Sequence, residues 1–231
     1  MTSQAGRVGP LEPVDITDRL AAVRDRIAAA GRGPDQVAVV AVTKGFGPDA
    51  VRAAAAAGIA DVGENYAQEL SPKWDSTSGA GLRWHFLGRV QTNKVRALAP
   101  IVHLWQGVDR VGAGEEISRR GRGAGVLVQV RISGPPERNG CEPDAVLGLV
   151  ERLDGLGLDV RGLMAVGPGG PPELARPGFR RVAALADRLG LSIRSMGMTD
   201  DLTVAVQEGS TMVRIGRGLF GERPMAPRKR R

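Results

Sequence analysis

The sequence predicts an α/β protein with one domain: a closed parallel (β/α)8 barrel of the TIM type, with an extra helix in front of its first strand. Eight short apolar runs alternate with segments of helical periodicity along the 231 residues. Regular alternation of this kind is typical of parallel strands joined by helices. No G-x-G-x-x-G sequence follows the first apolar run, which counts against the alternative of a doubly wound open sheet that binds a dinucleotide.

The first elements are predicted from their periodicity and from the residues that end them. Apolar residues spaced by three to four predict an amphipathic helix over 15–30, which the stretch GRGP ends. The run VAVVAVTK at 37–44 predicts a buried strand, because it is continuously apolar up to its lysine and is followed by Gly and Pro. Pro48 then begins an alanine-rich helix over 49–57.

The rest of the barrel follows the same alternation. Further strands are predicted at 59–62, 82–87, 101–105, 126–132, 160–166, 191–196 and 211–215. Further helices are predicted after Tyr66 and at 92–98, 111–119, 144–153, 177–189 and 200–207, with polar loops at 73–80, 133–139 and 167–172. We expect the barrel to span 15–222, between a disordered N-terminus over 1–14 and a basic disordered tail over 223–231.

Composition limits the class of protein. No apolar run approaches the length of a bilayer, and the N-terminus contains no apolar signal core, so we expect a soluble cytoplasmic protein with no membrane partner. The single cysteine, Cys141, excludes an internal disulfide and a cysteine-rich metal site. Basic residues at 228–231 supply more than half of the net charge of +7. No aromatic platform accompanies them, so we expect a solvated tail and no nucleic-acid partner.

Lys44 lies at the carboxyl end of the first predicted strand, where parallel barrels place their active sites. Lysine is rare in this chain, since arginine occupies nearly every other basic position. A Schiff base requires a primary amine that can lose its proton, which a guanidinium does not provide. Lys44 is therefore a candidate for Schiff-base chemistry. The structural alternatives are a lysine that reaches solvent and a lysine paired with Glu64.

Two stretches near the end of the chain predict an anion site. In RIGRG at 214–218, glycine lets the backbone approach a phosphate, and successive N–H groups can form a concave nest. Thr199 follows the seventh predicted strand, where it adds a hydroxyl and is expected to cap the next helix. Alone, each stretch is more typical of an ordinary strand-end turn or helix cap. Together, at the last two strands, they match the usual phosphate site of a barrel.

Three other reactive side chains favour structural roles. His85, inside the third predicted strand, is typical of a hydrogen-bonded histidine, and no second ligand lies at metal-binding spacing, so we predict no metal site. Tyr66, the only tyrosine, is expected to pack or to form a hydrogen bond. Cys141 has no histidine partner within sequence reach and is expected to be chemically inert.

Six segments occur in order between about residue 15 and residue 222: AVTK (41–44), GENYAQE (63–69), WHFLGRVQTNK (84–94), RGLMAV (161–166), SMGMTDD (195–201) and GSTMVRIGRGLFG (209–221). Together they resemble the pyridoxal phosphate homeostasis proteins, also called PLP-binding proteins, which are related to the barrel domain of alanine racemases. Each segment is weak evidence alone, but six in register are specific.

The resemblance implies an alanine-racemase-like barrel that holds pyridoxal 5′-phosphate (PLP) as a Schiff base on Lys44. It also implies the cofactor contacts: Arg214 facing the pyridine nitrogen, Asn65 near the ring, His85 near the mouth of the barrel, and Thr199, Gly216 and Arg217 at the phosphate. The family usually has threonine where this chain has Arg217, so we expect a backbone contact there rather than a side-chain contact.

The resemblance also implies a carrier that buffers and delivers PLP rather than an enzyme. Racemisation requires an acid/base group on each face of the substrate, and the related racemases take the second one, a tyrosine, from an additional domain. This chain ends shortly after its eighth predicted strand. We expect a monomer, and the resemblance implies PLP and PLP-dependent apo-enzymes as its partners. Two alternatives stay open: a weak PLP-dependent amino-acid racemase, and a phosphate-binding aldolase that uses Lys44 as its Schiff-base lysine.

Overall fold

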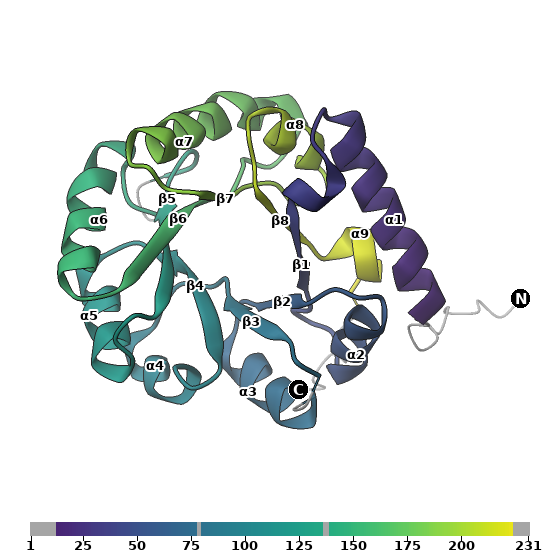
Figure 1. Ribbon diagram of the computed structural model, residues 1–231, viewed down its shortest axis with the longest axis horizontal. Helices are drawn as coiled ribbons and strands as arrows, with labels where there is room; N and C mark the ends of the chain where they lie inside the picture. The colour runs from purple at the N-terminus through teal and green to yellow at the C-terminus, as the bar shows by residue number, and fades with distance from the viewer. Residues whose placement is uncertain (1–12, 78–79, 136–138, 224–231) are drawn as a thin grey trace, which may run out of the picture.

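The computed structural model describes residues 13–77, 80–135 and 139–223. Its eight parallel strands pair in chain order, and β1 pairs with β8 to close the barrel. The helices surround this ring of strands (Figure 1). The predicted (β/α)8 barrel is confirmed, and the extra N-terminal helix is present as α1 (Pro13–Ala29). Of the ends predicted to be disordered, 1–12 and 224–231 lie outside the described residues.

The strands occur where the sequence predicts them, with ends that shift by a few residues. They are β1 (Ala38–Val42), β2 (Asp61–Glu64), β3 (Arg83–Phe86), β4 (Val102–Val108), β5 (Gly125–Val130), β6 (Asp159–Ala165), β7 (Ile193–Ser195) and β8 (Met212–Ile215). In the pairing that closes the barrel, Ala38 is opposite Met212 and Ala41 is opposite Ile215.

The helices that follow the strands are also close to their predicted ranges. They are α2 (Pro48–Ala56), α3 (Ala67–Thr77), α4 (Thr92–Leu98), α5 (Val111–Arg120), α6 (Val146–Gly155), α7 (Arg176–Arg188), α8 (Leu202–Gln207) and α9 (Arg217–Phe220). Three short 3₁₀ turns, η1 (Pro34–Gln36), η2 (Pro143–Ala145) and η3 (Pro172–Ala175), begin with proline, whose fixed φ suits the first position of such a turn.

One local prediction is wrong, and one helix was not predicted. The segment 73–80 was expected to be a polar loop, but α3 continues to Thr77. Leu70 and Lys73 are buried one turn apart, and they give this polar helix an inner face. No element was predicted after Ile215, but this segment forms the short helix α9, whose Leu219 and Phe220 are buried in the core.

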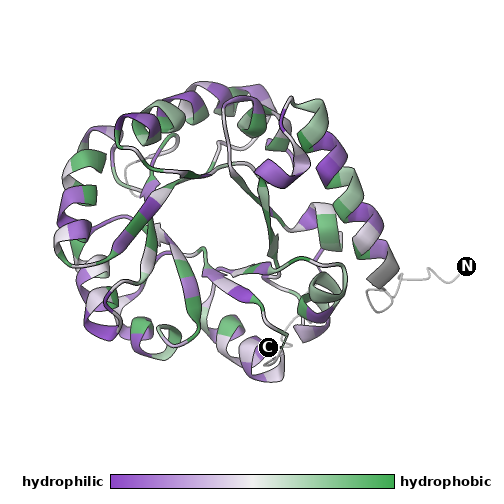
Figure 2. Ribbon diagram, in the orientation of Figure 1, coloured by the Kyte–Doolittle hydropathy of each residue, from purple (hydrophilic) through white to green (hydrophobic). Residues whose placement is uncertain are grey.

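Hydrophobic side chains cover both faces of the barrel sheet. The larger cluster lies between the strands and the helices and includes Val62 and Trp105. A smaller cluster, with Val40 and Leu104, lies in the barrel interior. Leu104 and Trp105 are neighbours on β4, and their opposite directions follow from the two-residue period of a strand. Figure 2 shows the same arrangement, with hydrophobic strands inside helices that carry both hydrophobic and hydrophilic residues. None of the described helices combines the length and hydropathy that a membrane crossing requires.

Candidate functional site

A cavity of about 340 Å³ lies at the carboxyl ends of the barrel strands. Six of the seven residues singled out in the sequence line this cavity, which we call the Lys44 pocket: Lys44, Asn65, Thr199, Arg214, Gly216 and Arg217. They come from opposite ends of the chain, and they meet because all eight strands end on this face. Apolar side chains, including Val42 and Met164, form another part of the wall.

Lys44 is half-buried, two residues beyond the end of β1. Burial lowers the pKa of its amine, and the positive charges of Arg223 and Arg214 lower it further. The carboxylates of Glu64 and Glu69 act in the opposite direction with a smaller effect. A lowered pKa leaves more of the amine unprotonated near neutral pH, and only the unprotonated amine is nucleophilic. The alternative of an ion pair with Glu64 is wrong, because that carboxylate pairs with another lysine.

A buried ion-pair network fixes the backbone on both sides of the pocket lysine. On one side, Lys73 Nζ donates to the carbonyl oxygen of Thr43 (2.8 Å). The same ammonium donates to Glu64 Oε1 (2.5 Å) and to Glu69 Oε2 (3.0 Å). On the other side, the Gly45 amide donates to Glu69 Oε2 (2.7 Å). The network therefore fixes the chain immediately before and after residue 44.

Glu64 is the buried anion of this network. Its Oε1 accepts hydrogen bonds from Lys73 and from the Thr43 hydroxyl (2.6 Å), whereas its buried Oε2 has no partner among the described residues. Burial raises the pKa of Glu64, although the hydrogen bonds from Lys73 and Thr43 oppose this shift. The network was not predicted from the sequence, because Lys73 lies in a segment that was expected to be a loop. The four-residue spacing from Glu69 to Lys73 is the helical signal that could have revealed it.

Arg214 is a buried cation that reaches the pocket from β8. Its guanidinium donates to the Ser195 carbonyl oxygen (2.6 Å), to Ser195 Oγ (2.7 Å) and to the Ala165 carbonyl oxygen (2.8 Å). All three acceptors are neutral. Burial lowers the pKa of Arg214 to about 10, while the charge of Asp201 opposes this shift. The side chain stays cationic at neutral pH and is held in one orientation.

Thr199 and Gly218 join the loops that follow the last two strands. The Thr199 hydroxyl accepts a hydrogen bond from the Gly218 amide (3.0 Å), so its own hydrogen is available to another acceptor. The expectation that Thr199 caps the next helix is wrong, because Asp201 occupies the N-cap position of α8. Arg217 is exposed and forms an ion pair with Asp200. Its side chain is therefore engaged, which favours its backbone as the phosphate contact.

The N-terminal helix supports these loops from outside. Arg26, on α1, donates to the Thr199 carbonyl oxygen (2.9 Å), and Arg19 donates to the Leu219 carbonyl oxygen (2.9 Å). Helix α1 lies beside α8 and α9, although these elements are far apart in the sequence (Figure 1). The extra helix thus contributes hydrogen bonds to the segment that carries the predicted phosphate contacts.

Arg223 also lines the Lys44 pocket, although it was assigned to the disordered tail. It is exposed, and it lies over the turn that follows Lys44. A Cβ on Gly45 would come within 2.9 Å of Arg223 Cδ, and Gly45 has a φ of +78°. Glycine therefore allows both the turn and the close approach of Arg223. No pattern in the sequence identifies Arg223, because its position depends on where the chain runs after α9.

His85 does not lie at the mouth of the barrel. It is buried in the barrel interior on β3, two residues before Leu87, which does line the Lys44 pocket. Because inward-facing residues of a barrel strand form successive layers, His85 lies one layer below the pocket. Its Nε2 is 2.9 Å from Asp61 Oδ1, and its Nδ1 is 2.7 Å from Gln106 Nε2. The sequence-based reading of a hydrogen-bonded histidine matches this placement.

A chain of hydrogen bonds connects His85 to Arg214 through the barrel. Arg214 donates to Ser195 Oγ, which donates to Gln106 Oε1 (2.7 Å). The Gln106 amide nitrogen then meets His85, which meets Asp61. The guanidinium and the amide nitrogen are donors only, so each group donates to the next, and His85 carries its hydrogen on Nε2. His85 therefore acts on the pocket through Arg214 rather than by contact.

Asn65 is positioned by a close approach of two loops. A Cβ on Gly88 would lie 2.1 Å from the Asn65 carbonyl oxygen, so only glycine allows this approach.

Tyr66 is 56% exposed, so the expectation that it packs is wrong. Burial raises the pKa of the Cys141 thiol to about 11, which keeps it unreactive. Within 13–77, 80–135 and 139–223, no cluster of His, Cys, Asp and Glu is arranged to hold a metal ion.

The closed barrel, with a lysine after β1 and an arginine on β8, belongs to the class of barrels found in the N-terminal domain of alanine racemase. The family model described as "Alanine racemase, N-terminal domain" matches residues 18–224. A curated relative from Pseudomonas aeruginosa, named "Pyridoxal phosphate homeostasis protein", is 41% identical over 218 residues, covering 90% of this chain and 94% of that protein. A relative of the same name from Aquifex aeolicus is 37% identical over 226 residues, covering 91% and 99%.

The chain therefore belongs to the pyridoxal phosphate homeostasis proteins, and the resemblance drawn from the six sequence segments is confirmed. Among solved structures, PipY of Synechococcus elongatus PCC7942 with PLP bound superimposes with a TM-score of 0.77 at 32% identity. That comparison covers 89% of this chain and 100% of PipY.

Proposed function

We propose that this protein binds PLP reversibly, as a Schiff base on Lys44, and serves the homeostasis and delivery of PLP inside the cell. One observation carries the proposal: a lysine whose pKa is lowered and a buried arginine bound only to neutral oxygens line the same pocket. The names of the relatives and the PLP bound in PipY support it. We propose a cytoplasmic monomer whose recipients are PLP-dependent apo-enzymes.

The residues of the pocket fit PLP. A buried cation without a carboxylate in contact is costly unless the site serves an anion or a ring acceptor, and Arg214 is such a cation. The lining also includes the basic side chains of Lys44, Arg217 and Arg223 against the single carboxylate of Asp200. PLP brings an aldehyde, a pyridine nitrogen and a phosphate dianion, which match an amine, a guanidinium and this positive field.

Each residue of the pocket has a distinct task. Lys44 would offer an unprotonated amine to an aldehyde. Arg214 would donate toward a ring nitrogen, and because its guanidinium is a donor only, it would not protonate that nitrogen. Thr199 Oγ and the backbone at Gly216 and Arg217 would hold the phosphate end. When bound, PLP supplies an electrophilic carbon, and an unprotonated ring nitrogen weakens its capacity as an electron sink.

A carrier is favoured over the racemase alternative by the acid/base groups of the pocket. Apart from Lys44, the described lining residues include one carboxylate, Asp200, and it is paired with Arg217. Tyr66 and His85 do not line the Lys44 pocket. A racemase needs a second, opposed acid/base group. Among its described residues, the Lys44 pocket provides Lys44 as one acid/base group and no second group opposed to it.

The test is borohydride reduction of the PLP-loaded protein followed by peptide mass spectrometry. We expect the reduced cofactor on the peptide that contains Lys44, and loss of the visible absorbance of bound PLP in Lys44→Ala. Lys94→Ala, which changes a lysine outside the pocket, should keep both signals. Equal visible absorbance in wild type and Lys44→Ala would refute the assignment. Loss of α-deuterium from labelled amino acids at catalytic rates would favour the racemase instead.

A further inference from the structure

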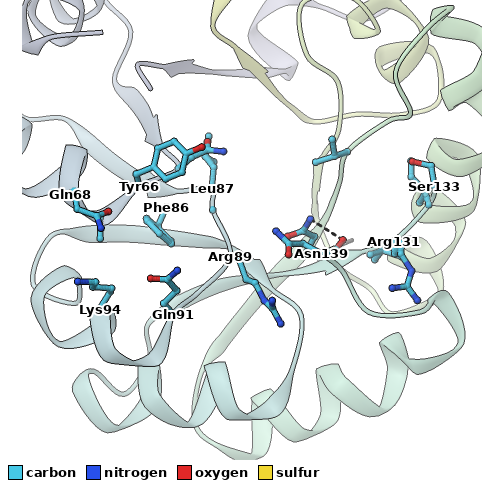
Figure 3. A pocket seen from close by; sticks show the side chains of 17 residues that line it. Tyr66, Gln68, Phe86, Leu87, Arg89, Gln91, Lys94, Arg131, Ser133 and Asn139 are labelled. Carbon is cyan, nitrogen blue, oxygen red and sulfur yellow. Dashed lines mark hydrogen bonds between the residues drawn. The ribbon is translucent and has the colours of Figure 1, made fainter. Parts of the chain in front are cut away.

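A second cavity, of about 480 Å³, adjoins the Lys44 pocket. The two share Asn65, Leu87 and Val166 in their linings, so this adjoining pocket opens next to the predicted cofactor site. It is formed by the segments that follow β2, β3 and β5. Figure 3 shows Lys94 and Arg131 on opposite sides of it, with Arg89 between them. Its volume lies in the range typical of small-molecule sites.

The adjoining pocket is cationic. Arg89, Lys94 and Arg131 line it, and none of its described lining residues is an aspartate or a glutamate. Arg131 forms an ion pair with Glu142, which lies outside this lining. The side chains of Arg89 and Lys94 have no hydrogen-bond or ion-pair partner among the described residues. Two cations without such a partner lie beside one cavity that has no carboxylate in its described lining, and this combination favours an anionic ligand.

The rest of the lining determines the kind of anion. Phe86, Leu87 and Ile132 provide an apolar part of the wall. The side-chain amides of Gln68 and Gln91 provide hydrogen-bond donors and acceptors near the unpaired cations. Inorganic phosphate has no apolar surface to place against this wall. A small organic anion uses both parts, because burial of its hydrocarbon adds to the charge-assisted hydrogen bonds.

We propose that the adjoining pocket binds a small organic carboxylate, with the carboxylate at Arg89 and Lys94 and the apolar body against Phe86 and Leu87. The site does not depend on a Schiff base at Lys44. A ligand in it lies beside the Lys44 pocket, because Asn65 and Leu87 line both cavities. The pocket is therefore a place where a carboxylate-bearing amine can be held next to the lysine.

The test is isothermal titration of the protein with butyrate, and with succinate as a second probe. We expect saturable binding at one site, with an affinity for the neutral butyramide about ten-fold weaker, since the charge-assisted hydrogen bonds are lost. Arg89→Gln and Lys94→Gln should each weaken butyrate binding about five-fold or more. Arg96→Gln, on the same helix as Lys94 but outside the lining, is the matched control and should bind as wild type does.

Two results would overturn the proposal. One is the absence of saturable butyrate binding, and the other is inorganic phosphate binding as tightly as butyrate in both wild type and Arg89→Gln. Circular dichroism and the melting temperature of each variant show whether it is folded. Lys44→Ala separates the two sites: it should lose PLP and keep butyrate binding, so failure of the PLP assignment and failure of the carboxylate site give different results.

Discussion

At the scale of single residues, Lys44 differs from an ordinary surface lysine in the charges around it. Burial lowers the pKa of its amine, and Arg223 adds the largest effect of a neighbouring charge. Because Arg223 is exposed and lies beyond the last helix, its effect on the pKa of Lys44 can be removed by substitution more readily than the effect of burial. Because the amine must be unprotonated to react, the environment of Lys44 determines the pH at which it does so.

The first prediction concerns this pH. Lys44 should be acetylated by acetic anhydride at a lower pH than a lysine in a model peptide, because its pKa lies below the usual value of 10.5. Arg223→Gln removes a positive charge, raises the pKa of Lys44 and should shift the rate profile to higher pH. Arg96→Gln should leave the profile unchanged. Peptide mass spectrometry measures the rates, and identical profiles for the wild type and Arg223→Gln would contradict the proposed effect.

The second prediction concerns Lys73. Lys73→Met leaves the buried carboxylate of Glu64 without its cation, so the free energy of unfolding should fall by about 3 kcal/mol. The double variant with Glu64→Gln should recover part of this loss, because the buried charge is gone. Urea denaturation measures both. If the losses of the two single variants simply add in the double variant, the ion pair does not couple these residues.

At the scale of elements, the site depends on helices that do not contact the cavity directly. Helix α3 brings Lys73 to the end of β1, and α1 supports the loops after β7 and β8. The existence of these helices could be predicted from periodicity, and α4 was predicted to the residue at 92–98. The end of α3 was missed, because its polar residues resemble a loop and the four-residue spacing from Glu69 to Lys73 is the one helical signal there.

The third prediction concerns α1. Arg26→Ala removes the hydrogen bond to the Thr199 carbonyl oxygen, so the phosphate contacts should be held less rigidly. The affinity for PLP should fall about five-fold, as expected for one lost hydrogen bond to a charged donor. Arg24→Ala is the matched control, since Arg24 is exposed on the same helix. Visible absorbance titration measures both affinities, and equal values would show that α1 does not support the site.

At the scale of the whole molecule, the residues that line the Lys44 pocket at strand ends were easier to predict than the residues that support them. Lys44, Thr199 and Arg214 lie at strand ends, and a closed parallel barrel brings all strand ends together. The depth of His85 could not be predicted in the same way, because one layer of barrel depth corresponds to only two residues along a strand. Arg223 depends on the path of the chain after α9, which has no sequence periodicity.

The fourth prediction concerns acid stability. Burial raises the pKa of Asp61, but hydrogen bonds from Arg83 and His85 outweigh this and hold the pKa well below its usual value. The unfolded chain then binds more protons in acid, so the contribution of Asp61 is complete above about pH 5 and is lost as the pH falls through the folded pKa. Asp61→Asn should lose about 2 kcal/mol at pH 7 and depend less steeply on pH below pH 4.

Urea denaturation at several pH values tests this effect. Asp25→Asn, a change at an exposed position of α1, is the matched control and should follow wild type at every pH. If the free energy of unfolding of Asp61→Asn falls with decreasing pH as steeply as that of wild type, this carboxyl group does not determine the pH dependence of stability.

The hydrogen-bond chain from Arg214 to Asp61 also bears on how the barrel finds its alignment. Its five members come from β8, β7, β4, β3 and β2, and each bond requires a donor to face an acceptor. Sliding any one of these strands by two residues would keep every hydrophobic side chain on its proper face and still break the chain. The polar interior therefore distinguishes the native arrangement from misaligned barrels that hydrophobic packing alone would accept.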